Sequence, residues 1–272
     1  MTKENSIQIG DVFLLGNHRL ACGDCRDKKL IVRLFEKEKA KLLCQDPPYA
    51  IAVVEGKEGF TSSKTKRKPI ANDHLQSEEE YIQFTADSLE AIKPFLERKN
   101  SVYIFNSDKM IFALKIGMEK AGFKFTQLII WVKNHSIIGR MDYLPQHELI
   151  AYGWFGQHDF LRSKDKSVLI FPRPSKSKAH PTMKPLGLLR RIILNSSKIG
   201  DVVFDGFGGS GQTLLACEQT KRSCFMVELD PEYCQTIIDR FEKMSGVKAE
   251  RLETNTQKDE QEKEHNNQKT DS

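Results

Sequence analysis

The sequence predicts an α/β fold with a doubly wound, mostly parallel sheet, and two observations favour it. Short apolar runs rich in β-forming residues alternate with segments of helical periodicity along most of the chain. Such alternation is typical of parallel strands joined by right-handed crossovers, which place helices on both faces of a sheet. The second observation is a glycine-rich turn at residues 206–211, between an expected strand and an expected helix.

The first half of the chain contains clear boundary signals. Gly16-Asn17 separates two short apolar runs and predicts a β-hairpin. Ser77 and Glu80 match a capping box at the start of a helix, and Gly122 ends another helix. The expected elements are a hairpin (11–15 and 18–22), a helix (28–39), a strand (42–44), a helix (78–94), a strand (102–105), a helix (107–121) and a strand (125–132).

The second half continues the alternation after an irregular stretch. We expect a helix (186–197), a strand (201–205), a helix (212–220), a strand (224–228) and a helix (232–244). Residues 248–272 are poor in apolar side chains and are predicted to form a disordered polar tail. The folded domain is therefore expected to span residues 1–247.

Composition limits the class of protein. The chain has 272 residues, 39% of them hydrophobic, which suits one large domain or one core with a small insert. No apolar run reaches the roughly 18 residues that a membrane span requires, and we see no signal peptide. We therefore expect a cytoplasmic protein with no membrane partner.

Positive charge lies mainly in the expected domain. Residues 248–272 hold five Lys or Arg and seven Asp or Glu, a net −2, and the whole chain carries +5. Residues 1–247 therefore carry +7, which suits a polyanionic partner such as nucleic acid.

The six cysteines predict free thiols rather than disulfides or a metal site. Cys22 and Cys25 form a C-x-x-C pair, but no second pair at similar spacing accompanies it, as a structural zinc site would need. A reducing compartment also disfavours disulfides. We expect no bound metal.

The glycine-rich turn has the pattern of an adenosine-binding site. Gly206, Gly208 and Gly211 satisfy G-x-G-x-x-G, and Glu228 ends the next expected strand. Glycines allow a ligand to approach the backbone, and an acidic side chain at the next strand end can bind ribose hydroxyls. A nicotinamide dinucleotide and S-adenosylmethionine share the adenosine half, so the turn alone does not separate them.

A second motif, Asp46-Pro47-Pro48-Tyr49, directly follows the buried strand at 42–44. A carboxylate there can accept a hydrogen bond from an amino group. The two prolines stiffen the turn, and the Tyr49 ring offers a face on which a base can stack. If the strands at 42–44 and 202–204 flank the point where strand order reverses, both motifs meet in one crevice.

These motifs, in this order, resemble the β class of amino-group DNA methyltransferases, whose glycine motif follows the catalytic tetrad. The resemblance covers residues 9–246, and the chain is similar to phage- and prophage-type DNA modification methylases. It also rests on Gly23-Asp24-Cys25, Gln146-His147-Glu148, His180-Pro181-Thr182-Met183-Lys184-Pro185 and Glu228-Leu229-Asp230-Pro231-Glu232-Tyr233. The chain departs from the family pattern at Gly206, where proline is common.

The resemblance implies a Rossmann-like methyltransferase sheet with permuted motif order. It implies S-adenosylmethionine as cofactor and methyl transfer to N6 of a flipped adenine in double-stranded DNA. Asp46, Pro47, Pro48 and Tyr49 would be catalytic. The expected cofactor-binding residues are Asp24, Cys25, His180, Thr182, Lys184, Asp205, Phe207, Gly208, Gly209, Ser210, Gly211, Glu228 and Asp230. Lys184 would meet the methionine carboxylate.

Two stretches are expected to contact DNA. Residues 134–179 mix basic and aromatic side chains and are interpreted as an inserted target-recognition region. Residues 50–77 are interpreted either as a lid over the flipped base or as a solvated loop. The candidate DNA-binding residues are Lys64, Lys66, Arg67, Lys68, Arg140, Gln146, His147, Arg162 and Arg173.

Other functions stay open at this point. Family members that methylate N4 of cytosine commonly begin the tetrad with serine, so Asp46 favours adenine over cytosine. An RNA substrate, a nicotinamide-dependent oxidoreductase and a catalytically inactive DNA-binding protein are further alternatives. The resemblance also leaves open pairing as a homodimer and a cognate restriction endonuclease.

Overall fold

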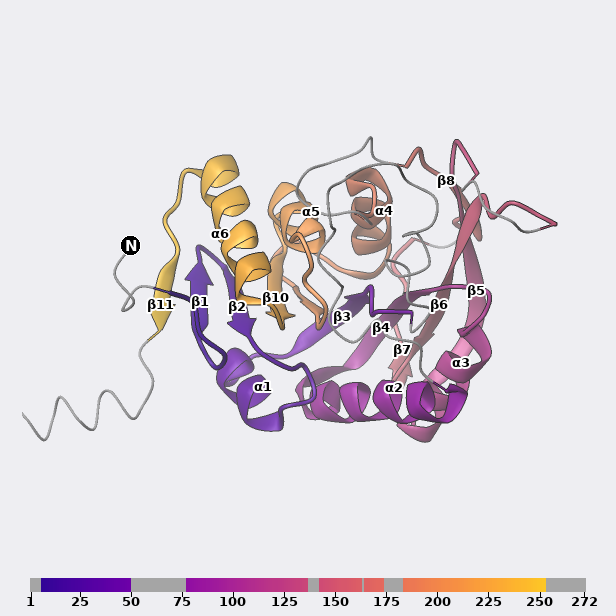
Figure 1. The fold of residues 1–272 in the computed structure, drawn as a ribbon, viewed down its shortest axis with the longest axis horizontal. Helices are drawn as coiled ribbons and strands as arrows, with labels where there is room; N and C mark the ends of the chain where they lie inside the picture. The colour runs from indigo at the N-terminus through magenta and orange to yellow at the C-terminus, as the bar shows by residue number, and fades with distance from the viewer. Residues whose placement is uncertain (1–5, 50–76, 137–141, 163, 174–182, 253–272) are drawn as a thin grey trace, which may run out of the picture.

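The computed structural model describes residues 6–49, 77–136, 142–162, 164–173 and 183–252 (Figure 1). One 11-stranded sheet runs through this part of the chain in the order β11-β1-β2-β10-β9-β3-β4-β6-β5-β8, with β7 paired to β4. The strands are β1 Val12–Leu15, β2 His18–Cys22, β3 Ala40–Gln45, β4 Leu96–Asn106, β5 Lys124–Val132, β6 His147–Trp154, β7 Gln157–His158, β8 Val168–Ile170, β9 Val202–Asp205, β10 Ser223–Glu228 and β11 Glu250–Leu252.

Helices cover both faces of this sheet (Figure 1). They are α1 Lys28–Phe35, α2 Glu78–Ile92, α3 Ile111–Lys120, α4 Leu186–Ser196, α5 Gln212–Thr220 and α6 Pro231–Ser245, with a 3-10 turn at Lys93–Phe95. One hydrophobic cluster joins α1, α2 and α3 to one face, and a second joins α4, α5 and α6 to the other. The predicted doubly wound architecture is confirmed.

The centre of the sheet is parallel. Strands β2, β10, β9, β3 and β4 pair in parallel along the sheet. From β9 the chain passes through α5 to β10, and from β3 it passes through α2 to β4, on the opposite side. Strand order therefore reverses between β9 and β3, which is where ligands bind in open α/β sheets.

Strand β3 illustrates why strands at the centre of the sheet contain consecutive apolar residues. All six of its residues are buried, and its side chains alternate between the two clusters: Leu43 belongs to one, and Leu42 and Cys44 to the other. A strand covered by helices on both faces needs apolar residues on both.

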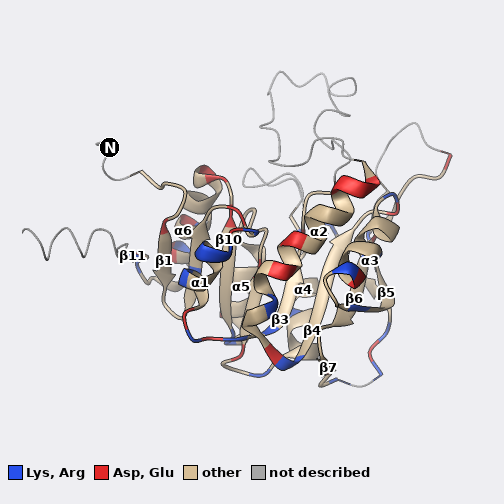
Figure 2. Cartoon of the chain, turned by 90° about the horizontal axis from the view of Figure 1, so that it is seen from below, with Lys and Arg blue, Asp and Glu red and all other residues tan. Residues whose placement is uncertain are grey.

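Local signals place several element ends where the sequence predicts them. The hairpin of β1 and β2 is antiparallel. At the start of α2, Ser77 accepts from the Glu80 N–H and the Glu80 side chain accepts from the Ser77 N–H, so the predicted capping box is present. Figure 2 marks the acidic positions of α2 in red along its ribbon, and the first turn of this helix contains Glu78, Glu79 and Glu80. These charges stabilise the positive end of the helix dipole.

Other boundaries differ from the prediction. The helix expected at 28–39 ends at Phe35, where Glu36 takes a positive φ of 53°. The helix expected at 107–121 begins only at Ile111. Strand β4 begins at Leu96 rather than 102. The prediction missed this start because Arg98 and Lys99 are charged and exposed, which is not typical of a buried strand.

The interpretation of residues 134–179 as an inserted region is wrong for β6. This strand lies between β4 and β5, antiparallel to both, and its residues 149–153 are buried. Three polar residues, Gln146-His147-Glu148, precede the apolar run, and they make the strand hard to recognise from the sequence.

The prediction of a disordered tail from residue 248 is also wrong at its start. Strand β11 pairs antiparallel with β1 at the sheet edge. Arg251 forms an ion pair with Asp11 at 3.4 Å and lies 5.3 Å from the centre of the Phe13 ring. These contacts order a segment whose composition alone indicates disorder, and residues 253–272 lie outside the described residues.

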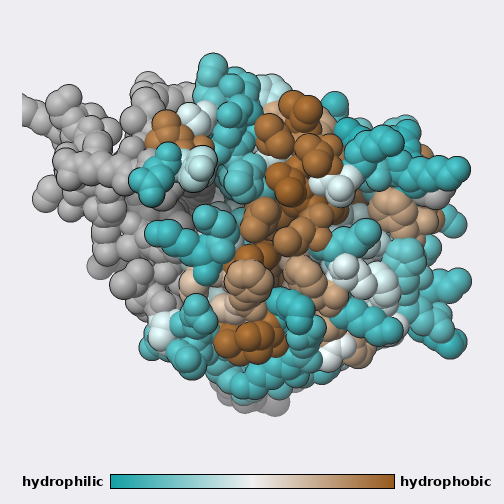
Figure 3. Space-filling view, turned by 90° about the vertical axis from the view of Figure 1, so that its right-hand side faces the viewer, coloured by the Kyte–Doolittle hydropathy of each residue, from teal (hydrophilic) through white to brown (hydrophobic). Residues whose placement is uncertain are grey.

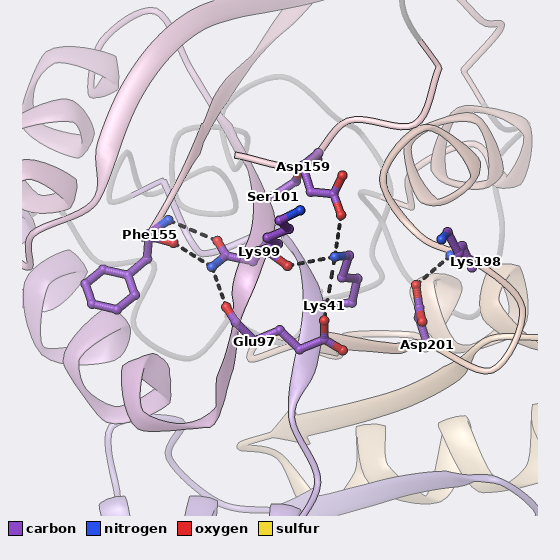
Figure 4. Close-up of polar contacts among 9 residues, drawn as sticks. Lys41, Glu97, Lys99, Ser101, Phe155, Asp159, Lys198 and Asp201 are labelled. Carbon is purple, nitrogen blue, oxygen red and sulfur yellow. Dashed lines mark hydrogen bonds and ion pairs between the residues drawn. The ribbon is translucent and has the colours of Figure 1, made fainter. Parts of the chain in front are cut away.

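A buried lysine ties the segment after β7 to the amino ends of the central strands (Figure 4). Lys41 Nζ donates to Asp159 Oδ2 at 2.5 Å and to the Lys99 carbonyl at 2.8 Å, and Glu97 lies 3.6 Å away. The Ser101 hydroxyl donates to the Asp159 carbonyl. The segment that contains Asp159 is therefore fixed at the edge opposite the carboxyl ends of the strands.

None of the helices in the described ranges is both long and apolar enough to cross a membrane. All six cysteines are buried and unpaired.

Candidate active site

A pocket of about 370 Å³ opens beyond the carboxyl ends of the central strands. Asp46 follows β3, Asp205 ends β9, Glu228 ends β10 and Asp24 follows β2, and all four line the pocket. The strands at 42–44 and 202–204 are neighbours and parallel. The two motifs singled out in the sequence therefore meet in one crevice, as the switch-point argument predicts.

Glycines shape the turn between β9 and α5. A Cβ added to Gly208 would lie 2.8 Å from the Met226 sulfur, and Gly211 has a φ of 78°. A Cβ at Gly206 would lie 3.1 Å from Nε2 of Gln45, so this position, where proline is common in the resembling family, is closely packed. Side chains at these positions would displace the turn from its neighbours.

The N–H groups of this turn are bonded inside the protein. Gly208 donates to Val227 and Gly211 donates to Gly208, each at 2.8 Å. Phe207 donates to the Asp205 carboxylate at 3.0 Å. A phosphate-binding turn points such N–H groups at its anion, so this turn suits an adenosine ligand without pyrophosphate.

Two carboxyl groups at the strand ends are buried, and both have raised pKa values. Burial raises the pKa of Glu228 to about 7, although the N–H groups of Asp230 and Gly209 donate to it at 2.9 and 2.6 Å. Burial also raises the pKa of Asp205 to about 7, against a side-chain hydrogen bond from Thr213. The Glu228 carboxyl thereby bridges the glycine turn and the cap of α6.

The Gly23-Asp24-Cys25 segment forms an adjoining wall. Asp24 accepts from the Arg26 guanidinium at 2.6 Å, and this partner outweighs burial and keeps the pKa of Asp24 low. Burial raises the pKa of the Cys25 thiol, so it stays protonated. Arg26 lies 5.2 Å from the centre of the Phe84 ring, which contacts Phe207 with ring centres 5.8 Å apart.

Asp46 is held from two sides. The Tyr49 hydroxyl donates to Oδ1 at 2.8 Å, and Lys184 Nζ donates to Oδ2 at 2.6 Å. A carboxylate offers about four lone-pair positions, so Asp46 keeps acceptor capacity for another N–H group. Pro47 and Pro48 also line the pocket beside it.

Lys184 is a buried ion-pair partner here. Its side chain is 6% exposed and pairs with Asp46 and, at 3.2 Å, with Glu148. The rings of Tyr49 and Phe105 have their centres 5.4 and 5.2 Å from Nζ. Burial opposes the charge, but the two carboxylates outweigh it and raise the pKa of Lys184. The ammonium therefore faces Asp46 in the structure.

Two further residues belong to the site. The sequence marks Glu148 only within the Gln146-His147-Glu148 match, without a role, and does not mark Lys133. Glu148 accepts from Tyr49, and its Oε1 lies 2.8 Å from Nζ of Lys133. Lys133 follows β5 and is 2% exposed. The contact between Glu148 and Tyr49 gives no spacing signal in the sequence, because the two residues are 99 positions apart. The available signal was the Gln146-His147-Glu148 match, which the sequence alone did not tie to a role.

The candidate DNA-binding residues fall into three groups. His147 and Arg173 are exposed and line the pocket. Gln146 is exposed, and its amide donates to the Lys133 carbonyl at 2.9 Å. Arg162 is exposed beside Leu161, whose N–H donates to the carbonyl of Asn195 near the end of α4, away from the pocket.

Several expected residues lie outside the described residues. These are His180 and Thr182 among the cofactor-binding residues, and Lys64, Lys66, Arg67, Lys68 and Arg140 among the DNA-binding residues. The remaining expected cofactor residues, with Ser210 and Asp230 among them, line the pocket, except Gly211, which follows the lining residue Ser210 in the chain.

Comparison with known proteins agrees with this geometry. The type II methyltransferase M.HpaI of Haemophilus parainfluenzae is 27% identical over 245 residues, which cover 80% of this chain and 73% of that protein. The solved M1.HpyAVI–SAM complex superposes with a TM-score of 0.61 at 23% identity, over 81% of this chain and 97% of that one. The cytosine-N4-specific PvuII DNA methyltransferase superposes with a TM-score of 0.66 at 18% identity, over 83% and 86%.

These structural likenesses confirm the Rossmann-like methyltransferase fold. The DNA methylase model, which covers N6 and N4 methyltransferases, matches residues 40–167 and 154–239. Those segments contain the Asp46 tetrad, the glycine turn and Glu228. The chain belongs to the DNA methylase family.

Proposed function

We propose that this DNA methylase transfers a methyl group from S-adenosylmethionine to N6 of adenine in double-stranded DNA. The observation that carries the proposal is the single pocket that holds both the Asp46 carboxylate and the glycine turn. The adenine preference rests on Asp46 as the first residue of the tetrad. Methylation of cytosine N4 is the alternative that the same pocket would serve.

The pocket residues fit this cofactor. Glycines at 208 and 211 let the turn pack closely on Met226 and Ile237, and its internally bonded N–H groups do not require a phosphate. Glu228, at the end of β10, would accept from ribose hydroxyls. When bound, S-adenosylmethionine supplies an electrophilic methyl carbon on a sulfonium.

Asp46 would act on the nucleophile. The target amino group is stacked inside the duplex, so the base must leave the helix to reach the pocket. The free lone pairs of Asp46 and the Pro47 carbonyl would accept its two N–H bonds and direct the nitrogen lone pair towards the methyl group. Positive charge develops on this nitrogen during transfer, and the nearby carboxylate stabilises it.

Tyr49 would provide a stacking surface for the flipped base. Lys184 lies on one side of the Tyr49 ring, and the Tyr49 hydroxyl is held by its hydrogen bond to Asp46. A base would therefore stack on the remaining ring face. Exposed His147 and Arg173 at the pocket are proposed to contact the DNA around it, together with the basic residues at 64–68.

The Asp46→Ala variant tests this assignment. We expect S-adenosylmethionine affinity within a few-fold of the wild type by calorimetry, and methyl transfer reduced by at least about 100-fold, because a preorganised electrostatic contact is lost. Asp239→Asn, on the exposed face of α6, is the matched control and should keep full activity. Transfer near the wild-type rate in Asp46→Ala would refute the catalytic role of Asp46.

We also propose that two copies of the chain pair. Figure 3 shows apolar side chains gathered on the side of the molecule formed by α3, β5 and β8. Phe112, Ile116, Leu128, Val168 and Ile170 are exposed large apolar residues of these elements. Strand β8 ends the sheet, and an apolar edge strand is normally covered. A second copy offers the same surface for an isologous interface.

A cognate restriction endonuclease is the remaining proposed partner. Its support is the type II methyltransferase designation of M.HpaI and of M2.DpnII from Streptococcus pneumoniae. Such a pair would recognise one DNA sequence, with methylation protecting it from cleavage.

A further inference from the structure

The antiparallel strand β6 brings a carboxylate to the catalytic edge. Because β6 runs against β4, its first residues lie where β4 ends. Glu148 is the second residue of β6 and sits opposite Trp131 of β5. Lys133 follows β5 at the same edge, and its N–H donates to the Gln146 carbonyl at 2.8 Å. Sheet topology therefore places Glu148 beside the Asp46 tetrad.

Glu148 contacts three groups around the tetrad. Its Oε1 lies 2.8 Å from Lys133 Nζ, and its Oε2 lies 3.2 Å from Lys184 Nζ. The Tyr49 hydroxyl, which also donates to Asp46, lies 3.1 Å from the same Oε2. Two carboxylates and two ammonium groups are thus joined into one charge-balanced cluster.

Burial makes this balance necessary. The side chains of Lys133 and Lys184 are 2% and 6% exposed, and an unpaired charge so buried is costly. Burial opposes ionisation of Glu148, but the two lysines outweigh it and keep the pKa of Glu148 low. Without this carboxylate, the buried Lys133 ammonium would lose its ion pair, and Lys184 would keep its pair with Asp46.

The same contacts fix the orientation of Asp46. Lys184 donates to Asp46 Oδ2 and also pairs with Glu148. The one O–H proton of Tyr49 is shared between Asp46 Oδ1 at 2.8 Å and Glu148 Oε2 at 3.1 Å. Burial, followed by the charges of Asp46 and Glu148, raises the pKa of Tyr49, so its hydroxyl keeps the proton that it donates. Both partners of Asp46 are therefore anchored on Glu148.

We propose that Glu148 is a positioning residue for methyl transfer, holding the Tyr49 hydroxyl and the Lys184 ammonium that orient the Asp46 carboxylate. The proposal rests on the proposed function, in which Asp46 binds the target amino group. Glu148 acts through these two neighbours and itself needs no contact with the reacting atoms.

Glu148→Gln tests the proposal by separating kcat from KM. We expect kcat for methyl transfer to fall by about 10- to 100-fold, the usual effect of removing a group that orients a reacting side chain. KM for S-adenosylmethionine and for DNA should stay within about threefold. Glu148→Asp keeps the charge and should recover part of the loss. Glu97→Gln, at the opposite edge beside Lys41, is the matched control with wild-type kinetics.

The pH profile provides a readout that a purely structural role would not change. Lys184 faces Asp46, Glu148 and the rings of Tyr49 and Phe105. Removing the Glu148 charge removes one of the two carboxylates that stabilise the ammonium form. The Glu148→Gln rate should therefore begin to fall at a lower alkaline pH than the wild-type rate, whereas Glu97→Gln should follow the wild type.

The outcomes separate this proposal from the proposed function. An unchanged kcat and pH profile in Glu148→Gln, with Asp46→Ala inactive, overturns the role of Glu148 alone. A large rise in either KM at constant kcat also overturns it, because it indicates a binding role. Activity in Asp46→Ala refutes both. If Glu148→Gln fails to fold, Glu148→Asp is measured instead, and a wild-type kcat with a wild-type alkaline limb in that variant overturns the proposal.

Discussion

Asp205 and Glu228 are weak acids because burial outweighs their hydrogen bonds, which raises both pKa values to about 7. The sequence identifies both residues, since Asp205 ends the strand before the glycine turn and Glu228 ends the next strand. It does not identify their acidity, which depends on how completely the folded chain covers them. The role of Glu148, and Lys133 altogether, were missed for a related reason. Their partners are distant in the chain, and only the pairing of β5 with β6 brings them together.

At this scale we predict a pH-dependent stability difference. The folded pKa of Glu228 lies above its unfolded value, so between about pH 4.5 and 7 the folded state holds a proton that the unfolded state has lost. Its contribution to stability therefore declines as pH rises through this window. Glu228→Gln does not titrate at this position. As pH rises through the window, its unfolding free energy should therefore increase relative to that of the wild type by up to about 1 kcal/mol per pH unit. Urea unfolding at pH 5, 6 and 7 measures this, and parallel curves would contradict it.

The elements near both sheet edges were the hardest to predict. Central strands such as β3 and β9 are buried on both faces and stand out as apolar runs. Strand β6 is hidden by its polar first residues, and β11 by a composition, Glu250-Arg251-Leu252, that indicates solvent. Tertiary pairing with β4, β5 and β1 orders these segments, and propensity alone does not report such pairing.

Truncation separates the ordered strand from the residues after it. A chain that ends at Leu252 should melt at the wild-type temperature, whereas one that ends at Val247 should melt several degrees lower. The shorter chain loses the pairing of β11 with β1 and the Arg251–Asp11 ion pair. A loss of about 1–2 kcal/mol corresponds to roughly 2–8 °C in a domain of this size. Equal melting temperatures in calorimetry would mean that β11 does not contribute to stability.

For the whole molecule, motif order and strand order agree. The tetrad precedes the glycine turn in the chain, yet β3 and β9 are neighbours, so a permuted sequence builds one pocket at the switch point. This arrangement was predictable because each motif follows a recognisable strand. The apolar side formed by α3, β5 and β8 was not predictable, because its exposed residues come from three separate segments.

We predict that this side mediates pairing of two chains. Sedimentation equilibrium should give twice the chain mass of 31.2 kDa for the wild type. Ile170→Lys places a charge on the edge strand β8 and should shift the protein to single chains. Val32→Lys, an exposed apolar position on α1, is the control and should leave the mass unchanged. A wild-type protein that sediments as a single chain would contradict the proposed dimer.

The most direct test of the central claim is the identity of the methylated base. The purified protein is incubated with isotope-labelled S-adenosylmethionine and unmethylated genomic DNA, and the nucleosides are resolved by mass spectrometry. We predict label in N6-methyladenine, absent from the Asp46→Ala reaction. Label in N4-methylcytosine would contradict the adenine assignment while keeping the pocket chemistry. No label in any nucleoside, with cofactor binding intact, would contradict the proposed activity itself.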